Sequence, residues 1–473
     1  MDEQISLPSS WAWATIDDIG IVASGSTPST KEEDNFGGNI SWLTPADLSN
    51  YDGKYIKKGK RNLTEKGLKS CSATLLPEGS ILFSSRAPIG YTVIAANPIS
   101  TNQGFKNLIS FKEIFNEYIY HYLKGNKDLA ESFASGTTFK ELSARRFKKI
   151  PIPIPPFNEQ VRIVSKIEEL FSRLDQGVKA LQQTQQQLEL YQQSVLLQSF
   201  TGKLTEKWRI NNSLKPITIN KKIDVDISKL LIIPKEWKWY ALGDYATLKN
   251  GINFTRSQKG NRGILTIAVK NMYSEGLYVD SSDLYRVDKK VKNDRILQDG
   301  DILFVRSSVK REGVGWTSLF KKQNENVTYC GFIIRAKIFQ NDIDPKYLAY
   351  YCRTDFARDY LIGSSHQVVI TNINQNNLSN LPTPIPPYEE QIIIVDIIER
   401  FMSVIKNGIN IMMQNSAKIK SLKQSLLKKA FEGRLVPQDP TDEPASVLIK
   451  RIKNEKSKLK PNQKRGRKRG RKN

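Results

Sequence analysis

Cysteine and histidine are scarce in this chain, which limits the kinds of site it can hold. Its 473 residues include three cysteines, Cys71, Cys330 and Cys352, and two histidines, His121 and His366. No two cysteines have CxxC spacing, so neither a disulfide framework nor a zinc site is indicated. We therefore expect no metal site in this chain.

Long apolar runs are also missing. The longest apolar stretches, such as Ile392–Val395, are far short of the roughly 20 residues that a membrane-spanning helix needs. The first residues, Met1-Asp2-Glu3-Gln4, do not resemble a signal peptide. These two features together predict a soluble, cytoplasmic protein.

No motif in the sequence indicates a cofactor site. A Gly-rich loop followed by Lys-Ser/Thr is absent, so an ATP-driven motor is not expected. The segments Ile154–Phe157 and Ile385–Tyr388 look like the Asn/Asp-Pro-Pro-Tyr/Phe signature of adenine N6-methyltransferases. An isoleucine replaces the Asn or Asp, however, and its side chain cannot accept a hydrogen bond from the target amine. We therefore expect a chain that is not an enzyme and binds no cofactor itself.

What the sequence does contain is a long internal repeat. The segment PIPIPPFNEQ at 151–160 recurs as PTPIPPYEEQ at 382–391, an offset of 231 residues. Solenoid repeats run to only about 20–50 residues, so this period indicates two whole modules. Further pairs are Trp11/Trp237, Trp13/Trp239, Asp18/Asp244, Ile81–Phe83/Ile302–Phe304, Gly104-Phe105/Gly331-Phe332, Phe200/Phe431 and Gly202/Gly433. A shared frame with different interiors suggests one task performed on two different targets.

The charge balance favours a polyanionic partner. The chain carries 72 Lys and Arg against 48 Asp and Glu, a net charge of +24. Half of this excess lies in residues 450–473, where thirteen Lys and Arg face the single Glu455. The end of this segment is a low-complexity basic tail, which we expect to be disordered. Its plain interpretation is a solvated tail with loose affinity for nucleic acid.

The end of each copy has the pattern of a long helix. One heptad position is apolar throughout both copies, while the second is mixed and includes Gly177, Thr184 and Asn415. This mixture favours helices that pair with each other and with a partner, over an isolated parallel dimer. At 1.5 Å per residue, some 40 residues span about 60 Å, so the plain interpretation is a rigid spacer. The apolar position holds Ile167, Leu174, Leu181, Leu188, Val195, Ile398, Ile405, Met412, Ile419 and Leu426.

Each copy begins with a globular module of the α/β or α+β class. Short apolar strands are expected at Ser80–Phe83, Asp301–Val305 and Gly331–Ala336, and helices at Ile114–Leu123 and Pro345–Cys352. Many Gly, Pro and Asn turns separate them, and recognition side chains usually lie on such loops. The Trp11/Trp13 and Trp237/Trp239 pairs are expected to place both rings on one packed face.

Several turns carry residues suited to DNA. Ser26 and Thr27 offer hydroxyl groups to a phosphate, although a plain turn or helix cap explains them equally well. Arginine in the turns after the Ile-Leu-Phe strands could read guanine or grip a phosphate, against the alternative of a surface ion pair. These basic candidates are Arg86, Arg306, Lys310 and Arg311.

A second set of candidates precedes the Pro-rich segment of each copy. The first copy has Thr137, Thr138, Lys140, Arg145 and Arg146 there. The second copy has Asn372, Asn374 and Gln375, and Asn and Gln are the residues that pair with adenine edges. An Asn-rich loop with no such role is the alternative.

The chain resembles the DNA-specificity subunits of Type I restriction–modification systems. The residues that carry the resemblance are Leu7-Pro8 with Trp11, Gly25–Ser29, Trp42–Leu48, both Ile-Pro-Pro-(Phe/Tyr)-x-Glu-Gln segments, Phe431–Pro440 and Asp442–Ala445. The resemblance covers nearly the whole chain apart from the basic tail and the linker at about 205–232. The combination of these segments is specific, whereas no single one is.

The resemblance implies two target-recognition domains on two long helices that pair as an antiparallel coiled coil. The expected division is 1–158 and 233–388 for the domains, 159–203 and 389–433 for the helices, 204–232 for a linker, and 434–473 for a C-terminal segment with the basic tail. The family reads a bipartite, asymmetric DNA site, one half-site per domain. The implied partners are two adenine methyltransferase subunits, which bring S-adenosylmethionine, and restriction subunits that use ATP and Mg.

Three other interpretations stay open at this point. The chain could be a free-standing DNA-binding protein, a methyltransferase in its own right, or a coiled-coil scaffold whose tail binds RNA. Failure to bind a methyltransferase would favour the first, and binding of S-adenosylmethionine by the purified chain would favour the second. RNA binding lost on removal of 450–473 would favour the third.

Overall fold

The chain forms two compact units in a computed structural model, which describes residues 6–86, 88–136, 140–212, 214–224, 226, 230–274, 276–308, 313–363 and 371–458. Unit 1 comprises Met1–Ala180 and Gln414–Asn473, and unit 2 comprises Leu181–Met413. The basic tail after Lys458 lies outside the described residues. None of the described helices has the length and apolar character needed to cross a membrane.

Unit 1 is built around a five-stranded sheet. Its strand order is β2-β9-β6-β7-β4, with bounds Gly20–Ser24, Phe105–Ser110, Ile81–Ser85, Ile89–Ala95 and Tyr55–Ile56. A three-stranded sheet has the order β5-β3-β8, at Arg61–Leu63, Phe36–Leu43 and Ser100–Thr101. The short helices are α1 (Ile16–Ile19), α2 (Glu65–Lys69), α3 (Asn116–Gly125), α4 (Lys127–Ser132) and α5 (Ala144–Phe147). Most pairings are antiparallel, which makes the domain α+β.

Unit 2 repeats this plan with different details. Its central sheet has the order β12-β20-β16-β18, at Ala246–Asn250, Ile333–Ile338, Ile302–Val305 and Thr317–Leu319. A second sheet has the order β13-β15-β14-β19, at Lys259–Gly260, Tyr285–Val287, Ile264–Ile267 and Val327–Tyr329. The short helices are α7 (Glu206–Ile210), α8 (Pro345–Tyr351), α9 (Asp355–Gly363) and α10 (Gln375–Ser379). The strands and helices expected from the sequence are all present, with ends that differ by one or two residues.

A two-stranded ribbon leads from each domain into its long helix. In unit 1, β1 (Ala12–Thr15) pairs with β10 (Pro151–Ile154), and in unit 2, β11 (Lys238–Ala241) pairs with β22 (Pro382–Ile385). The Pro-rich segments are therefore extended, as their proline spacing predicts. The ribbons bury Trp11, Trp237 and Trp239, but Trp13 is 50% exposed, so the expectation that both rings of the first pair would pack was wrong.

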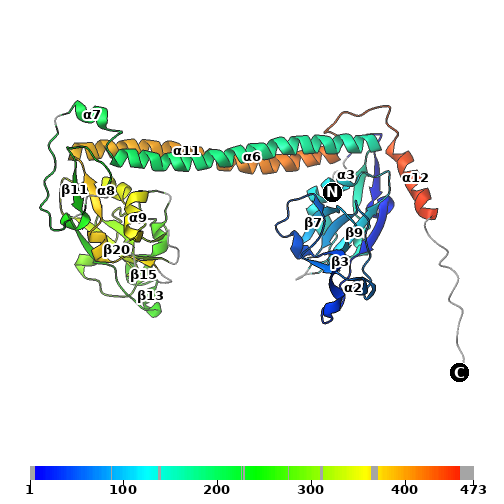
Figure 1. Cartoon of the computed structure of the whole chain (residues 1–473), viewed down its shortest axis with the longest axis horizontal. Helices are drawn as coiled ribbons and strands as arrows, with labels where there is room; N and C mark the ends of the chain where they lie inside the picture. The colour runs from blue at the N-terminus through cyan, green and yellow to red at the C-terminus, as the bar shows by residue number, and fades with distance from the viewer. Residues whose placement is uncertain are drawn as a thin grey trace, which may run out of the picture. The chain divides into compact units, whose positions relative to one another are not determined.

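Two helices of 44 residues follow the ribbons, α6 (Phe157–Phe200) and α11 (Tyr388–Phe431). In unit 1, the first half of α6 packs against the last half of α11, and Asp175 pairs with Lys423 at 2.5 Å. In unit 2, the second half of α6 packs against the first half of α11, and the Tyr191 and Phe401 rings lie 5.9 Å apart. Rising numbers on one helix meet falling numbers on the other, so the pairing is antiparallel (Figure 1).

The expected heptad seam faces the other helix. A Cβ on Gly408 would lie 3.3 Å from Leu188 Cδ1, and one on Gly177 would lie 3.9 Å from Ile419 Cδ1. Glycine thus lets a large seam residue of the opposite helix approach closely. Among the seam residues, Ile167, Val195, Ile398 and Ile405 are buried, and the other six are half-buried. The seam thus leaves part of its apolar surface exposed in each unit.

The last turn of each helix packs on the domain of the other sequence copy. In unit 2, the Phe200 ring packs edge-on against Tyr347 and Tyr351 of α8, at 5.2 and 5.3 Å. In unit 1, Phe431 meets Tyr118 and Tyr122 of α3 in the same way, at 5.4 and 5.0 Å. The first copy's helix end thus supports the second domain, and the second copy's helix end supports the first.

The same four tyrosines hold the Pro-rich strands. The hydroxyl groups of Tyr118 and Tyr122 donate to the carbonyls of Pro153 and Pro151, both at 2.7 Å. Tyr347 and Tyr351 donate to Pro384 and Pro382, at 2.7 and 2.6 Å. These bonds give polar partners to buried hydroxyls, so each aromatic pair joins ribbon, short helix and long helix.

The Glu-Gln pair at each helix start has a structural role. Gln160 donates to the Pro155 carbonyl at 3.1 Å and accepts from the Phe115 backbone N–H at 2.9 Å. Gln391 does the same with the Pro386 carbonyl and the Asp344 N–H, at 3.1 and 2.8 Å. Both glutamines are fully buried. They tie the start of the long helix to the turn that begins the short tyrosine-bearing helix.

Both helices end at a glycine with a positive φ, as the sequence predicts. Gly202 has a φ of 71° and Gly433 a φ of 70°. A Cβ on Gly202 would lie 2.5 Å from Pro234 Cγ, and one on Gly433 would lie 2.3 Å from Pro8 Cγ. Glycine is therefore required for the backbone conformation and for the close approach to the other copy's first strand.

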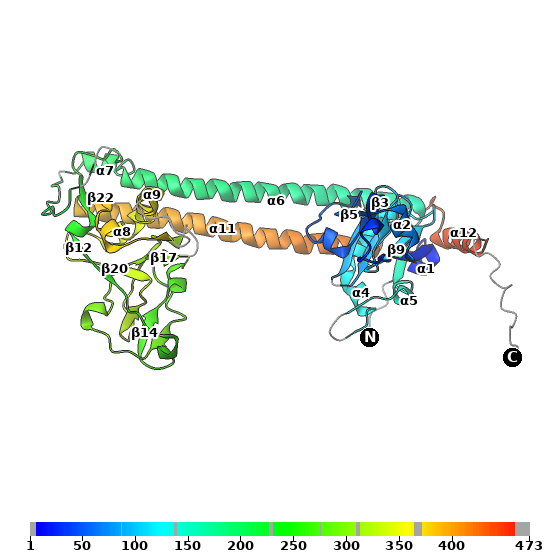
Figure 2. The same ribbon diagram turned by 60° about the horizontal axis from the view of Figure 1, so that its bottom comes forward.

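The segments that follow the helices complete the two cores. In unit 2, residues of the expected linker lie across the domain, where Ile217 and Ile219 are buried and the Lys222 N–H donates to Asp244 at 2.7 Å. In unit 1, helix α12 (Ala445–Lys458) lies beside α1 (Figure 2). It buries Leu448, Ile449 and Ile452, and Lys453 lies 3.6 Å from Asp18. An extended segment and a helix thus cover equivalent places.

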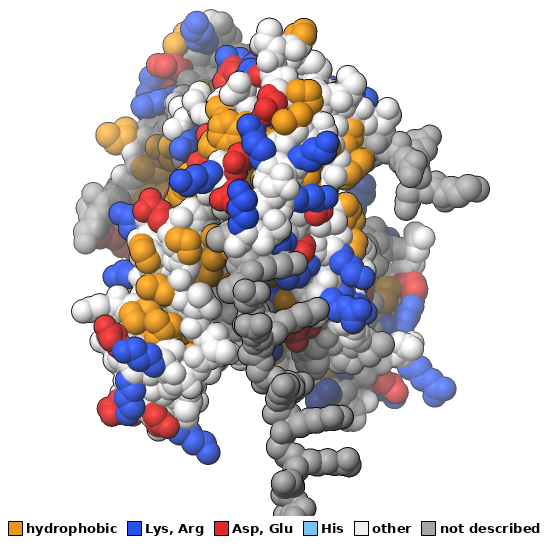
Figure 3. Space-filling view, turned by 90° about the vertical axis from the view of Figure 1, so that its right-hand side faces the viewer, with side chains coloured by type: hydrophobic (Ala, Val, Ile, Leu, Met, Phe, Trp, Pro, Cys, Tyr) orange, Lys and Arg blue, Asp and Glu red, His pale blue; other side chains and the backbone are white. Residues whose placement is uncertain are grey.

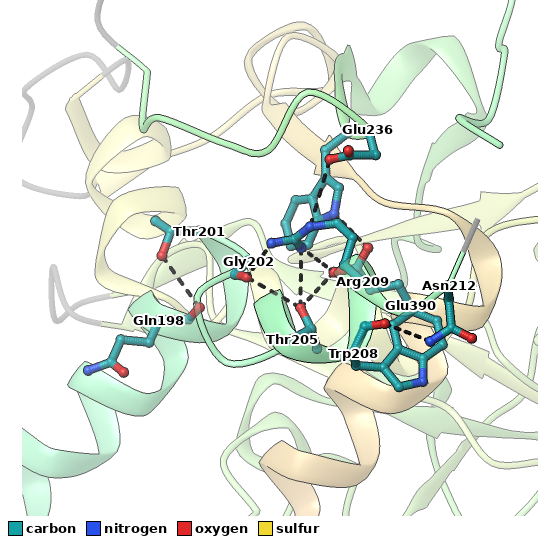
Figure 4. A network of polar contacts seen from close by, with 10 residues as sticks. Gln198, Thr201, Gly202, Thr205, Trp208, Arg209, Asn212, Glu236 and Glu390 are labelled. Atoms are coloured by element: carbon teal, nitrogen blue, oxygen red, sulfur yellow. Dashed lines mark hydrogen bonds and ion pairs between the residues drawn. The ribbon is translucent and has the colours of Figure 1, made fainter. Parts of the chain in front are cut away.

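A buried glutamate joins the helix start to the segment after the other helix in unit 2. Glu390, which is fully buried, accepts from Trp237 Nε1 at 2.9 Å and from Thr205 Oγ1 at 2.6 Å. Arg209 forms an ion pair with Glu390 and donates to the Gly202 carbonyl at 2.8 Å. Figure 4 shows Arg209 between Glu390 and Glu236. The buried carboxylate is therefore matched by a buried guanidinium.

The equivalent glutamate of unit 1 has no arginine of its own. Glu159 accepts from the Gln438 amide at 2.7 Å, while the nearby Arg162 pairs with Asp442 at 2.7 Å. Burial raises the pKa of Glu159, and the Trp11 indole, Gln438 and the charge of Arg162 offset only part of that effect. The two copies thus place the same side chain in opposite electrostatic situations.

We predict opposite results for the same substitution in the two copies. Glu390→Gln removes the buried carboxylate from Arg209, Trp237 and Thr205 and leaves Arg209 only the ion pair with Glu236 at 3.7 Å, so it should destabilise unit 2 by about 2 kcal/mol. Glu159→Gln should change the stability of unit 1 by less than about 1 kcal/mol at neutral pH. A raised folded-state pKa means that the stability from Glu159 is present below its unfolded pKa and lost as the pH rises through its folded pKa. Hydrogen exchange, read separately for peptides of each unit, measures both effects.

The exposed neighbour Glu389 provides the control for this prediction. Glu389→Gln removes the same charge from the same helix turn and should leave the exchange of unit 2 unchanged. Equal destabilisation by Glu159→Gln and Glu390→Gln at pH 7 would contradict the role assigned to Arg209.

Candidate nucleic-acid interface

One end of the central sheet of unit 1 gathers candidates from three parts of the chain. Strand β6 ends at Ser85, whose carbonyl accepts from the Leu142 N–H at 2.8 Å. The backbone of the next residue, Arg86, forms an isolated antiparallel β-bridge with that of Glu141. The Ser85 N–H donates to the Gly104 carbonyl at 2.7 Å. Arg86 is therefore held between the turn before β9 and the segment before α5.

Ser26 and Thr27 lie beside the same turn. The Ser26 N–H donates to the Thr101 carbonyl at 2.9 Å, and its own carbonyl accepts from Trp42 Nε1 at 3.3 Å. The Thr27 hydroxyl donates to the Gln103 side chain. The structure thus brings Ser26, Thr27 and Arg86 to one end of the sheet, as a shared binding role requires.

A lysine that the sequence did not single out completes this group. Lys106 is buried, and its Nζ lies 3.4 Å from Ser85 Oγ and 3.3 Å from the Gln103 carbonyl. Burial lowers the pKa of Lys106, the charge of Glu141 raises it, and the charge of Arg86 lowers it. The sequence did not indicate that Lys106 belongs to this group, because a lysine in a strand usually points to solvent.

The remaining candidates of unit 1 lie on the segment that follows. Lys140 is exposed and precedes Glu141. Arg145 and Arg146 are exposed on α5, which Ser143 caps by accepting from the Arg146 N–H at 3.3 Å. The Arg146 guanidinium donates to the Phe133 carbonyl at 3.2 Å. Thr137 and Thr138 lie outside the described residues.

Unit 2 builds the equivalent place from a short ribbon. Strand β17 (Ser307–Ser308) pairs with β21 (Thr371–Asn372), and the Ile373 N–H donates to the Arg306 carbonyl at 3.0 Å. Arg306 Nη1 donates to the Gly331 carbonyl at 3.4 Å. Ser307, directly after Arg306, thus pairs with Asn372 as Arg86 pairs with Glu141 in unit 1, and Arg306 itself corresponds to Ser85. Lys310 and Arg311 lie outside the described residues.

Asn374 and Gln375 of unit 2 differ in how far their side chains are available to contact DNA. Asn374 is the N-cap of α10, and its side-chain oxygen accepts from the Asn377 N–H at 2.8 Å. Asparagine is preferred at this position because that bond satisfies a free N–H of the helix. Gln375, the first residue of α10, is half-buried. Capping of α10 therefore accounts for the asparagine at position 374 without a role in DNA binding.

The two turns before β9 and β20 align differently from the sequence match. The sequence paired Gly104-Phe105 with Gly331-Phe332, but the strand registers pair Ser84 with Phe105 and Val305 with Ile333. The Phe332 carbonyl accepts from the Arg306 N–H at 2.8 Å, as the Gly104 carbonyl accepts from Ser85. Gly104 therefore corresponds to Phe332, and the sequence pairing was wrong by one residue.

Three basic side chains of α12 are paired with acidic side chains. Figure 3 shows Lys and Arg side chains among Asp and Glu side chains on one face of the molecule. On α12, Lys456 and Lys453 pair with Asp17 and Asp18, and Arg451 pairs with Glu443. These pairs hold α12 on unit 1, so its basic character alone does not mark a binding site.

Among the described residues, no group of three or more His, Cys, Asp or Glu side chains could hold a metal ion. What the two sheet ends share is an arginine at the end of the central strand, polar side chains from neighbouring turns, and a second segment paired beside it. Arginine, amide and hydroxyl groups can donate to phosphates and to base edges. The described part of this arrangement thus suits recognition.

The chain is similar to known DNA-specificity proteins along most of its length. The family described as the Type I restriction modification DNA specificity domain matches the chain twice, at residues 8–189 and 234–415. The specificity subunit of the Type I restriction enzyme MjaIX from Methanocaldococcus jannaschii is 30% identical over 447 residues, which cover 91% of this chain and 94% of that protein. The EcoKI specificity subunit of Escherichia coli K12 is 26% identical over 483 residues, with coverage of 95% and 96%.

Solved structures share the fold. A chain from a study of complex assembly and conformational transition of a Type I restriction–modification system has a TM-score of 0.68 at 20% identity, and the match covers 91% of this chain and all of that one. The HsdS subunit from Thermoanaerobacter tengcongensis has a TM-score of 0.56 at 20% identity, with coverage of 91% and 98%. With two domain matches and relatives along its whole length, the chain belongs to the family of DNA-specificity subunits of Type I restriction–modification systems.

Proposed function

We propose that the two sheet ends are the DNA-reading surfaces of this specificity subunit, each contacting one half of a split, asymmetric site. Residues 1–158 and 233–388 are the recognition domains. The observation that carries the proposal is that an arginine directly follows the central strand of each domain, Arg86 after β6 and Arg306 after β16, among different neighbours. The two arginines, one residue apart in the shared register, give both domains a guanine- or phosphate-binding group, and different neighbours give each domain its own sequence preference.

The catalytic steps belong to partner subunits in this proposal. Methyltransferase subunits bring S-adenosylmethionine, and restriction subunits use ATP and Mg. This chain supplies the recognition that places them on DNA and is not itself a catalyst.

The first test is the methylation pattern of cells that express this chain. Single-molecule sequencing should detect N6-methyladenine at one split, asymmetric motif when the chain is expressed with its neighbouring methyltransferase. The same cells without the chain should lack that motif. An active methyltransferase with no motif that depends on the chain would refute the specificity role.

We predict that Arg86→Ala and Arg306→Ala affect different half-sites. Loss of a base contact should weaken binding to the corresponding half by about 1–3 kcal/mol, roughly 5- to 150-fold, and relax its sequence. A phosphate contact would instead weaken binding to all sequences and lower the salt dependence. Competition binding with each half-site scrambled in turn measures both.

Matched controls lie on the long helices. Arg173 and Arg400 are exposed and pair with Glu169 and Asp396 of their own helices. Arg173→Ala and Arg400→Ala remove the same charge and should leave both half-sites unchanged. If Arg86→Ala and Arg306→Ala weakened the same half-site, the division between the domains would be wrong.

We propose that the methyltransferase docks on the helix pair in unit 2. Val404 and Ile411 of α11 are 69% and 57% exposed, and Leu190 and Leu197 of α6 are also exposed. Each pair is seven residues apart, so its members lie on one face of their helix. Leu197 also lines an apolar cavity of about 240 Å³ with Phe200 and Tyr351. Such exposed apolar stripes mark interaction sites.

We predict that Val404→Glu with Ile411→Glu reduces copurification of the methyltransferase subunit at least about tenfold, because a buried unpaired carboxylate is costly. Thermal unfolding should be unchanged, since both side chains are exposed. Ser403→Glu with Asn410→Glu places the same charges on a neighbouring exposed face and serves as the control. Full copurification of the first variant would exclude this face.

A further inference from the structure

Phe332 of unit 2 is exposed in a place where an aromatic ring has no role in folding. At 62%, it is the most exposed aromatic side chain among the described residues. Its neighbour Ile333 is fully buried in the core cluster around Leu303 and Val305, and Phe332 belongs to no apolar cluster of the described residues. Core packing therefore does not account for the phenylalanine.

The backbone fixes where this ring is presented. The Ile333 N–H donates to the Cys330 carbonyl at 3.0 Å, which closes a tight turn, and the Gly331 N–H donates to the Ile252 carbonyl at 2.8 Å. The Phe332 carbonyl accepts from the Arg306 N–H at 2.8 Å. Three bonded backbone segments hold the turn, so Phe332 projects from a rigid base directly beside Arg306.

The surroundings of Phe332 are polar groups suited to base edges and phosphates. Arg306 Nη1 donates to the Gly331 carbonyl at 3.4 Å, and a Cβ on Gly331 would lie 2.0 Å from Asn253 Oδ1. Asn372 lies on the strand paired with Ser307. A hydrophobic ring among an arginine and two amides is the composition expected of a DNA-reading surface, where apolar contacts accompany hydrogen bonds.

Unit 1 cannot present a ring at this position. The equivalent residue is Gly104, whose carbonyl accepts the bond from Ser85 that Phe332 accepts from Arg306. A Cβ on Gly104 would lie 2.8 Å from Pro45 Cγ and 3.0 Å from Asn102 Oδ1. The place is therefore filled by neighbouring side chains, and the aromatic contact is a feature of unit 2 alone.

We propose that Phe332 is a specificity-determining residue that makes an apolar contact to base pairs in the half-site read by unit 2. The inference rests on the proposed DNA-reading role of the sheet end and adds the residue and the kind of contact. Base–aromatic stacking and contact with a thymine methyl group are both open to an exposed ring held next to a base-reading arginine. The half-site read by unit 1 lacks this contact.

The test uses the complete chain with its methyltransferase subunits and DNA that carries the split motif. Phe332→Ala should weaken binding to the intact motif by about tenfold or more, the usual effect of losing an aromatic–base contact. Phe332→Leu, which keeps an apolar side chain, should retain part of the affinity. Base-by-base substitution should show relaxed discrimination at one or two adjacent positions of one half-site only.

Phe339 is a control from the other end of the same strand. It is 50% exposed and directly follows β20, which Phe332 directly precedes. Phe339→Ala removes the same exposed ring and should leave the affinity and sequence preference unchanged. Thermal unfolding of all variants should match that of the original chain, because neither ring is part of a core.

Three outcomes would overturn the proposal. The first is unchanged binding of the motif by Phe332→Ala, and the second is an equal loss of affinity on DNA whose unit 2 half-site is scrambled. The third is loss of methyltransferase copurification, which would assign Phe332 to a protein contact. Failure of the original chain to distinguish intact from scrambled motifs would instead refute the DNA-reading role itself.

Discussion

The packing of each helix end on the domain of the other sequence copy is the contact on which the rest of the structure depends. Phe200 lies against Tyr347 and Tyr351, and Phe431 against Tyr118 and Tyr122. Because the tyrosine hydroxyls bind the Pro-rich strands, one aromatic cluster joins ribbon, short helix and long helix in each unit. Neither domain completes its core with its own copy alone.

This crossed support explains why the frame of the repeat is kept while the interiors differ. The buried glutamine at each helix start binds the Pro-Pro segment, and the glycine after each helix packs closely against Pro8 or Pro234 of the other copy. Substitution of the glutamine leaves a buried polar group without its hydrogen-bond partner, and substitution of the glycine pushes the closely packed proline away. At the sheet ends, an exposed side chain such as Phe332 belongs to no core cluster of the described residues, so such positions can carry different recognition residues.

Even within the shared frame, the two copies differ in physical state. Glu390 is neutralised by Arg209, whereas burial raises the pKa of Glu159, whose neighbour Arg162 pairs with Asp442. The segments after the helices differ as well, since an extended linker in unit 2 covers the place that α12 covers in unit 1. Equivalent positions thus have the same structural role in the two units but interact with different partners.

The sequence by itself determined the duplication, the two long helices, their seam and the family. Each of these appears as a repeat, a heptad pattern or a motif that can be recognised without knowing the tertiary contacts. It also pointed to Arg86 and Arg306, which follow recognisable strands. Only the tertiary structure decided which helix end supports which domain, that Lys106 joins the group around Arg86, and that Phe332 takes the place of Gly104. These facts depend on strand register and on contacts between distant segments, and a shift of one residue in a turn reverses which side chain is buried and which is presented.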